Sequence, residues 1–231
     1  MVLYPHGPIH FVDDRLFIVE GRWKRSPFER KMTLFLLASG DVAIHSAIAM
    51  DEAGMAALEQ IGRPSWVLVP NVLHYSDAGW YGDRYPSARV LVPAAARAKL
   101  FEKVRRIDGS VDDDWPEALR GELTIVPLRG TRHSEVAFIH TASRTLVLTD
   151  AVFNYKERDL PWLARMIMRA NRAYGRFGPS RIFTSFVVND RDALHASIEE
   201  LLEHDFDRVI MSHGRVLDSG GKIAIREAFG N

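Results

Sequence analysis

The sequence contains no cysteine among its 231 residues. A disulfide framework, a thiolate zinc or iron–sulfur site and a thiol nucleophile are therefore excluded. Any transition-metal site must use histidine, aspartate or glutamate, and the chain has nine histidines. The candidate metal chemistry is thus limited to imidazole and carboxylate ligands.

The sequence also lacks an excess of one charge and a long apolar run. Thirty Lys and Arg balance thirty Asp and Glu, which argues against binding nucleic acid or an anionic membrane through the overall field. The longest apolar stretch, residues 32–40, is far shorter than the about 18–20 residues that span a bilayer. The first residues lack the basic start and apolar core of a signal peptide. We therefore expect a cytoplasmic protein with no nucleic-acid partner and no membrane span.

No linker, repeat or low-complexity segment divides the chain, so we expect a single domain over residues 1–231. Hydrophobic periodicity and turn residues predict two runs of strands, each closed by helices. This pattern indicates an α/β (α+β) fold, a four-layer αββα sandwich of two stacked mixed sheets with outer helices. The expected strands are 16–20, 33–38, 42–49, 66–69, 89–92, 123–128, 135–140, 145–149 and 208–211, and the expected helices are 51–62, 93–106, 160–177, 193–204 and 222–229.

Four of these strands run directly into possible metal ligands. His74 and Asp77 follow strand 66–69, and His133 follows strand 123–128. Asp150 and His213 follow strands 145–149 and 208–211. Imidazole and carboxylate groups that arrive from separate strand ends are what a zinc, iron or manganese site without thiolates needs. A histidine after a strand is more often a hydrogen-bonded loop residue, so from spacing alone both interpretations stay open.

Three stretches resemble motifs of the metallo-β-lactamase superfamily. Gly-Thr-Arg-His-Ser-Glu at 130–135, two strands and Asp-Ala-Val-Phe at 150–153 resemble its GHTPGS and TGDALF stretches, and Ser-His-Gly at 212–214 resembles its last motif. The order and spacing of these stretches agree with the superfamily from Val42 to Gly214. The resemblance implies that His133, Asp150 and His213 correspond to a ligand histidine, the metal-bridging aspartate and the final ligand histidine.

The superfamily's HxHxDH signature is absent from its expected place after strand 66–69. The Pro-Asn-x-x-His pattern that is present resembles a divergent, uncharacterised branch, which implies a single site completed by His74, with Asp77 nearby. Asp150, His74 and Asp77 are then the catalytic candidates, and the cofactor is one divalent metal, zinc first, with iron, manganese or no metal as alternatives. The four positions of HxHxDH are occupied by Asn71, Leu73, Tyr75 and Ser76.

The resemblance implies a metal-dependent, hydrolase-like protein that acts on a small ester, thioester, lactone or phosphoester. Its partner would be a small molecule, anionic in some of these classes. The alternative is a degenerate fold without catalysis that serves as a ligand-binding or interaction protein, for example as a homodimer. No GxSxG motif surrounds a serine, so a serine hydrolase is not expected.

Four arginines recur at helical spacing within residues 160–177. The simplest interpretation is a solvated helix face. One functional alternative is an anion-binding edge at Arg165 and Arg169, suited to a phosphorylated or carboxylated substrate. The other is a weak contact with a membrane surface. The four residues are Arg165, Arg169, Arg172 and Arg176.

Overall fold

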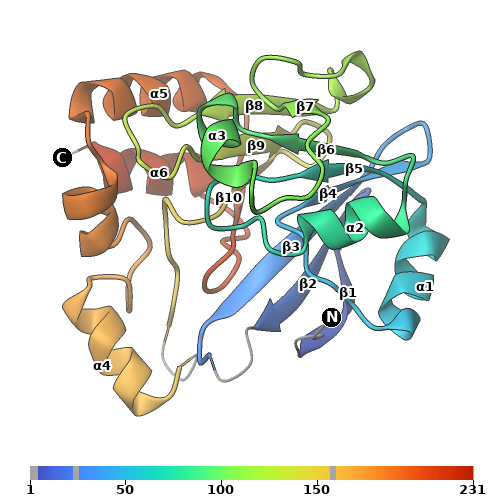
Figure 1. Ribbon diagram of the computed structural model, residues 1–231. Coiled ribbons are helices and arrows are strands. Elements are labelled where there is room, and N and C mark those ends of the chain that lie inside the picture. The colour runs from blue at the N-terminus through green and yellow to red at the C-terminus, as the bar shows by residue number, and fades with distance from the viewer. Residues whose placement is uncertain (1–4, 23–25, 157–159, 231) are drawn as a thin grey trace. The chain divides into compact units, whose positions relative to one another are not determined.

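The computed structural model describes residues 5–22, 26–156 and 160–230 (Figure 1). The chain divides into two compact units, an N-terminal unit, Met1–Glu122, and a C-terminal unit, Leu123–Asn231. Each unit contains one β-sheet and its own helices.

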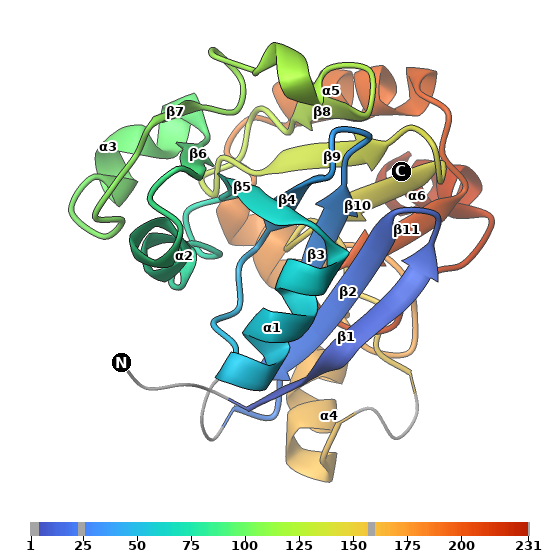
Figure 2. The same cartoon turned by 90° about the vertical axis from the view of Figure 1, so that its right-hand side faces the viewer.

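The N-terminal unit is built on a seven-stranded mixed sheet in which the strands follow chain order. Strands β1 to β4 form antiparallel hairpins, and β4 to β7 run parallel (Figure 2). Parallel neighbours need a crossover, and helices α1, Glu52–Ile61, and α2, Ala78–Arg84, supply two of them. The strands are β1 His6–Asp13, β2 Leu16–Arg22, β3 Glu29–Leu36, β4 Asp41–His45, β5 Arg63–Leu68, β6 Arg89–Val92 and β7 Gly109–Ser110.

Helix α1 confirms the helix expected over residues 51–62, and its end residues explain its bounds. The Asp51 carboxylate accepts a hydrogen bond of 2.8 Å from the Gly54 amide, which satisfies one of the free N–H groups of the first turn. Gly62 ends the helix. Met55 and Leu58 are buried in the core, three residues apart as a helix against a sheet requires.

The N-terminal unit contains elements that the sequence does not predict, and one predicted helix is wrong. Strand β1 and helix α2 are not expected from the sequence, because β1 is an edge strand with glycine and proline and no buried residue, and α2 contains two glycines. The expected helix 93–106 is a short 3-10 turn, Ala94–Ala96, followed by the single-turn helix α3, Arg97–Leu100. A second 3-10 turn, Glu117–Leu119, lies near the end of the unit.

The C-terminal unit contains a four-stranded mixed sheet in the order β11-β10-β9-β8. Strands β8 to β10 are antiparallel, whereas β10 pairs with β11 in parallel. Helix α5, Arg191–Glu203, is capped by Asp190, whose carboxylate accepts from the Ala193 amide at 3.0 Å. The strands are β8 Leu123–Pro127, β9 Val136–His140, β10 Thr145–Leu148 and β11 Arg208–Met211, and the other helices are α4 Trp162–Ala170, a π-helix Phe183–Val187 and α6 Gly221–Phe229.

Helix α4 is shorter than the sequence predicts. It ends at Ala170 instead of continuing to residue 177, and Arg172 beyond it has a left-handed backbone with φ of 55°. Only Arg165 and Arg169 of the expected stripe therefore lie on one helix face. The Asn171 side chain explains the end, because it accepts a hydrogen bond of 2.9 Å from the Ile182 amide and ties the turn to the next segment.

The predicted α/β class, with two mixed sheets and helices, is confirmed. Within the described residues no helix is long and apolar enough to cross a membrane. The arrangement that matters for function is the parallel pair β10 and β11, because two of the predicted ligands follow these strands.

Candidate metal centre

Asp150 and His213 meet because their strands are parallel neighbours. Leu148 of β10 pairs with Met211 of β11, and each candidate ligand lies two residues beyond its paired position (Figure 2). The His213 Nε2 and Asp150 Oδ1 atoms are 3.3 Å apart, with 19% and 11% of the two side chains exposed. Each offers one atom to a metal ion. The structure thus brings together the two predicted ligands that are 63 residues apart in the chain.

The loop that carries Asp150 is held by Glu135, a fully buried residue that is not predicted from the sequence as part of the site. The Thr149 amide donates to Glu135 Oε1 at 2.7 Å, and the Asp150 amide donates to Oε2 at 3.1 Å. Two backbone N–H groups at the end of β10 are satisfied in this way. Glu135 therefore positions Asp150 through the main chain.

Two carboxyl groups, those of Glu135 and Asp150, lie close together at this point. Burial raises the pKa of Glu135 well above its usual range, and the neighbouring Asp150 carboxylate raises it further. A carboxylate pair of this kind is destabilised by mutual repulsion unless a proton or a cation is shared. The site is therefore suited electrostatically to a bound cation.

The loop that carries His213 is held by Phe153 and Asn154, which follow Asp150 in the chain. The His213 ring stacks on Phe153, with centroids 5.6 Å apart and planes at 10°. The Asn154 amide nitrogen Nδ2 donates to the Arg215 carbonyl at 2.9 Å, and the Arg215 amide donates to the Asn154 carbonyl at 2.9 Å. Phe153 and Asn154 therefore hold the imidazole next to Asp150.

Gly214 allows this close approach, and we expect Gly214→Ala to lower the free energy of unfolding by about 1–3 kcal/mol. Its φ is +98°, and an added Cβ would lie 2.5 Å from the Asn154 carbonyl carbon. Gly175→Ala is the matched control, because its φ is +81° but nothing lies within 4 Å of the added Cβ. Urea unfolding of both variants measures the difference, and an equal loss in the two would contradict a role for close packing at Gly214.

His133 lies in the connection between β8 and β9, two residues before Glu135. Two hydrogen bonds hold this connection in place. The Thr131 hydroxyl donates to the Leu128 carbonyl at 2.9 Å. The Arg132 amide donates to the Val187 carbonyl at 2.8 Å. His133 is half-buried. Its role as a metal ligand stays a prediction.

His74 belongs to the N-terminal unit and lies in the loop after β5. The Asn71 side-chain oxygen accepts from the Leu73 and His74 amides at 2.8 and 2.9 Å, which forms a tight turn. The Ser46 hydroxyl, just after β4, is hydrogen-bonded to His74 Nδ1 at 2.8 Å. Within its unit His74 is thus a buried and oriented imidazole, and its role as a ligand and catalytic residue stays a prediction.

The neighbouring His45 is a core residue. It is fully buried at the end of β4, and burial together with the nearby His74 lowers its pKa to about 3. The ring is therefore neutral at physiological pH. This agrees with a structural role for the His45 side chain.

Asp77 takes part in a buried ion pair of the N-terminal unit. Its Oδ2 atom accepts from Arg30 at 2.5 Å and from the Ala49 amide at 3.1 Å. Only 12% of the Asp77 side chain and 4% of the Arg30 side chain are exposed. These contacts give Asp77 a structural function, and its predicted catalytic role stays a prediction.

Comparison with solved structures identifies the fold. The chain is similar to DIM-1 metallo-β-lactamase, with a TM-score of 0.69 and 13% sequence identity over 98% of both chains. The chain has the metallo-β-lactamase fold. The fold predicted from the sequence motifs is thereby confirmed, and at this identity the likeness extends to the fold alone.

Two further structures that are similar to this chain carry metals according to their descriptions. FIM-1 from Pseudomonas aeruginosa, in a mono-zinc form, matches with a TM-score of 0.61 and 9% identity over 97% of this chain and 92% of its own. The metal-soaked Flv1 flavodiiron core from Synechocystis sp. matches with a TM-score of 0.66 and 12% identity over 99% of this chain and 60% of its own. No protein-family model matches the chain, and neither does any curated protein.

Proposed function

We propose that this protein is a metal-dependent hydrolase that acts on a small ester, thioester, lactone or phosphoester. The observation that carries the proposal is the Asp150–His213 pair, 3.3 Å apart at the ends of two parallel strands in a metallo-β-lactamase fold. Neighbours of this fold are described as metal-bearing proteins. A site at strand ends leaves the packed sheet intact while its loops bind the substrate.

The donor set fits a divalent cation. One imidazole nitrogen and one carboxylate oxygen face each other, and the buried carboxyl group of Glu135 holds the Asp150 backbone behind them. Zinc, iron and manganese all accept such ligands, and zinc is the first choice for a site rich in histidine. A metal bound here would lower the pKa of bound water to near neutrality and polarise a carbonyl or phosphoryl oxygen.

The chain's own residues have distinct roles in this proposal. Asp150 and His213 hold the ion, and Glu135 fixes the backbone of Asp150. Phe153 and Asn154 fix the loop of His213 and limit the rotation of its imidazole ring. The sequence adds His133 and His74 as further ligands of a single site, and substitution of each by alanine tests that prediction separately.

The proposal is tested by metal analysis and hydrolysis assays on the same protein. We expect purified protein to bind about one equivalent of zinc, manganese or iron per chain. Hydrolysis of p-nitrophenyl acetate, a thioester, a lactone and bis-p-nitrophenyl phosphate should be measured before and after chelation. We expect at least one of these activities to disappear with EDTA and to return when metal is added.

A protein that binds no divalent metal, and in which His213→Ala and Asp150→Ala change no activity, would contradict the proposal. That outcome would favour the alternative of a metal-free binding protein. Metal binding without turnover of any ester class would contradict the proposed reaction while leaving the metal site in place.

A further inference from the structure

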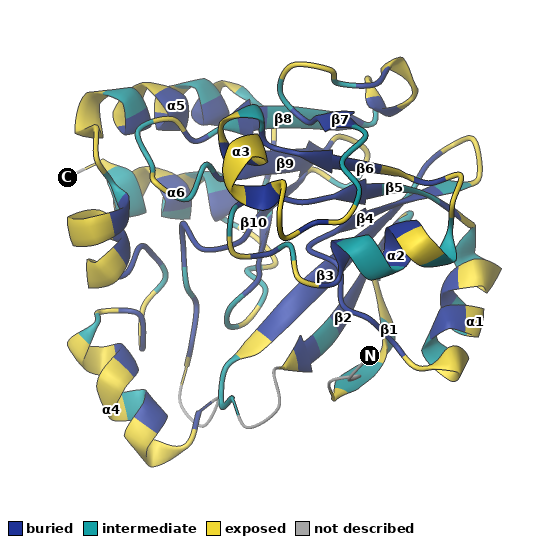
Figure 3. Ribbon diagram, viewed as in Figure 1, coloured by how far each residue is buried: buried dark blue, intermediate teal, exposed yellow. Residues whose placement is uncertain are grey.

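Helix α4 turns most of its apolar side chains toward solvent. Its buried residues are Ala164 and Met168, one turn apart (Figure 3). At about 100° per residue, the stripe opposite them consists of Trp162 and Met166, which are 65% and 58% exposed. The sequence does not reveal this orientation, because either side of the helix could face the core.

Two more stripes flank the exposed one. Leu163 and Ile167, one turn apart, are 57% and 56% exposed on one side. Arg165 and Arg169 lie on the other side, also one turn apart. We call these six residues the α4 patch, namely Trp162, Leu163, Arg165, Met166, Ile167 and Arg169.

The exposure is a local feature of this region. Six of the ten large hydrophobic side chains that are exposed in the described residues lie between Trp162 and Phe186. Ile182 is one of these six side chains and lies close to α4. The amide of the preceding residue, Arg181, donates to the Asn171 carbonyl at the end of α4 at 2.7 Å. A clustered apolar surface of this kind marks a contact site in a soluble domain.

The same region is strongly basic, although the whole chain is neutral. Residues 160–189 contain five arginines and neither aspartate nor glutamate. Within the described part of the chain, no carboxylate lies within ion-pair distance of Arg165 or Arg169, and the Arg169 guanidinium is 5.2 Å from the centre of the Tyr174 ring. The partner of the α4 patch must therefore accept both apolar side chains and positive charge.

We propose that the α4 patch docks on the surface of an anionic lipid bilayer. Tryptophan and arginine are suited to the headgroup level, and Leu, Met and Ile enter the acyl boundary just below it. The helix lies in the plane of the membrane and does not span it. A second copy of the chain fits less well, because each copy would bring Arg165 and Arg169 to the same interface. The proposal does not depend on the metal site.

The test is flotation of the whole chain with vesicles. We expect binding to vesicles of phosphatidylcholine and phosphatidylglycerol, little binding to phosphatidylcholine alone, and loss of binding as salt rises. The variant Arg165→Gln/Arg169→Gln should weaken the partition coefficient about fivefold for each arginine removed. Trp162→Ser/Met166→Ser should weaken it at least as much, because the inserted apolar area is lost.

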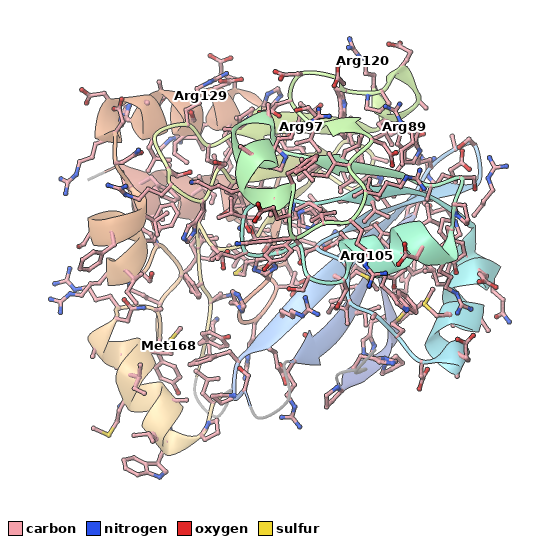
Figure 4. All side chains as sticks on the ribbon, in the orientation of Figure 1. Arg89, Arg97, Arg105, Arg120, Arg129 and Met168 are labelled. Carbon is pink, nitrogen blue, oxygen red and sulfur yellow. The ribbon has the colours of Figure 1, made fainter. Side chains whose placement is uncertain are left out.

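Matched controls come from exposed residues of the N-terminal unit. Phe101 is 74% exposed, and the Arg105 and Arg120 side chains, labelled in Figure 4, are 81% and 60% exposed. We expect Phe101→Ser and Arg105→Gln/Arg120→Gln to bind vesicles as the unchanged protein does. Thermal unfolding of every variant shows that the fold is kept.

Four outcomes would overturn the proposal. The first is equal binding to neutral and anionic vesicles, and the second is equal loss of binding in the control variants. The third is a concentration-dependent dimer in sedimentation that the α4 variants abolish while vesicles are not bound. If Arg165→Gln/Arg169→Gln lowers vesicle binding but Trp162→Ser/Met166→Ser does not, the protein adsorbs by charge alone. That result would also contradict docking through the apolar face.

Discussion

Asp150→Asn is expected to abolish metal binding while leaving the fold intact. The substitution keeps the size of the side chain but removes the charged oxygen that lies 3.3 Å from His213 Nε2. The loss of affinity should exceed the about 10–100-fold that changes in outer-shell residues cost, because a direct ligand is removed. Calorimetric titration with zinc and manganese measures the affinity, and any chelator-sensitive hydrolysis should fall in parallel.

The stability of the metal-free variant separates loss of metal from loss of fold. Asp150 raises the pKa of the buried Glu135, so removing its charge relieves a repulsion. We therefore expect metal-free Asp150→Asn to unfold at the same or a higher temperature than the unchanged protein. Asp205→Asn is the matched control, since this carboxylate pairs with Arg144 on the surface of the same unit. Unchanged metal affinity in Asp150→Asn would refute the assignment of Asp150 as a ligand.

Asp77→Ala is expected to lower the free energy of unfolding by about 3–5 kcal/mol. The substitution leaves the Arg30 guanidinium buried without its partner, and it removes the acceptor of the Ala49 amide. Desolvation of a charge that has lost its counterion is the physical reason for the large effect. Urea unfolding followed by circular dichroism measures the change.

The double variant Arg30→Met/Asp77→Leu tests whether the unpaired Arg30 charge causes the loss of stability. Replacing both charges by apolar groups of similar size removes the unpaired charge, so the loss should be smaller than for Asp77→Ala alone. Asp83→Ala is the surface control, because its pair with Arg105 is exposed and contributes at most about 1 kcal/mol. A loss in Asp77→Ala no greater than that of the control would contradict a structural ion pair.

Asp77→Asn distinguishes this structural role from the catalytic role predicted from the sequence. If Asp77 acts only through Arg30, the hydrolysis rate per folded molecule should be unchanged, although stability falls. A lower rate in fully folded Asp77→Asn would support the catalytic prediction instead.

Local sequence signals predicted the parts of the fold that local interactions determine. The caps at Asp51 and Asp190 contact amides only three residues away, so the starts of α1 and α5 can be derived from the sequence. Strands with apolar runs were found as well, including β11, which has the predicted bounds. Strand β1 and helix α2 were missed because their stability comes from neighbours and not from their own residues.

The candidate site was predicted only in part. The strand ends pointed to Asp150 and His213, and the structure brings these two together. Glu135 was missed, because its partners are backbone amides 14 and 15 residues further along, across a strand hairpin. A carboxylate next to an apolar strand was the available signal, and it does not by itself distinguish a buried residue from an exposed one.

The sequence by itself determined the ligand chemistry, because a chain without cysteine can offer a metal only imidazole and carboxylate groups. The sequence also determined the class of the fold, because its apolar runs predict strands and its apolar residues at helical spacing predict helices. Only the tertiary structure decided that Asp150 and His213 are neighbours, since parallel pairing of β10 and β11 is a long-range contact. It likewise decided that α4 presents Trp162 and Met166 to solvent, because packing against the rest of the unit selects which helix face is buried.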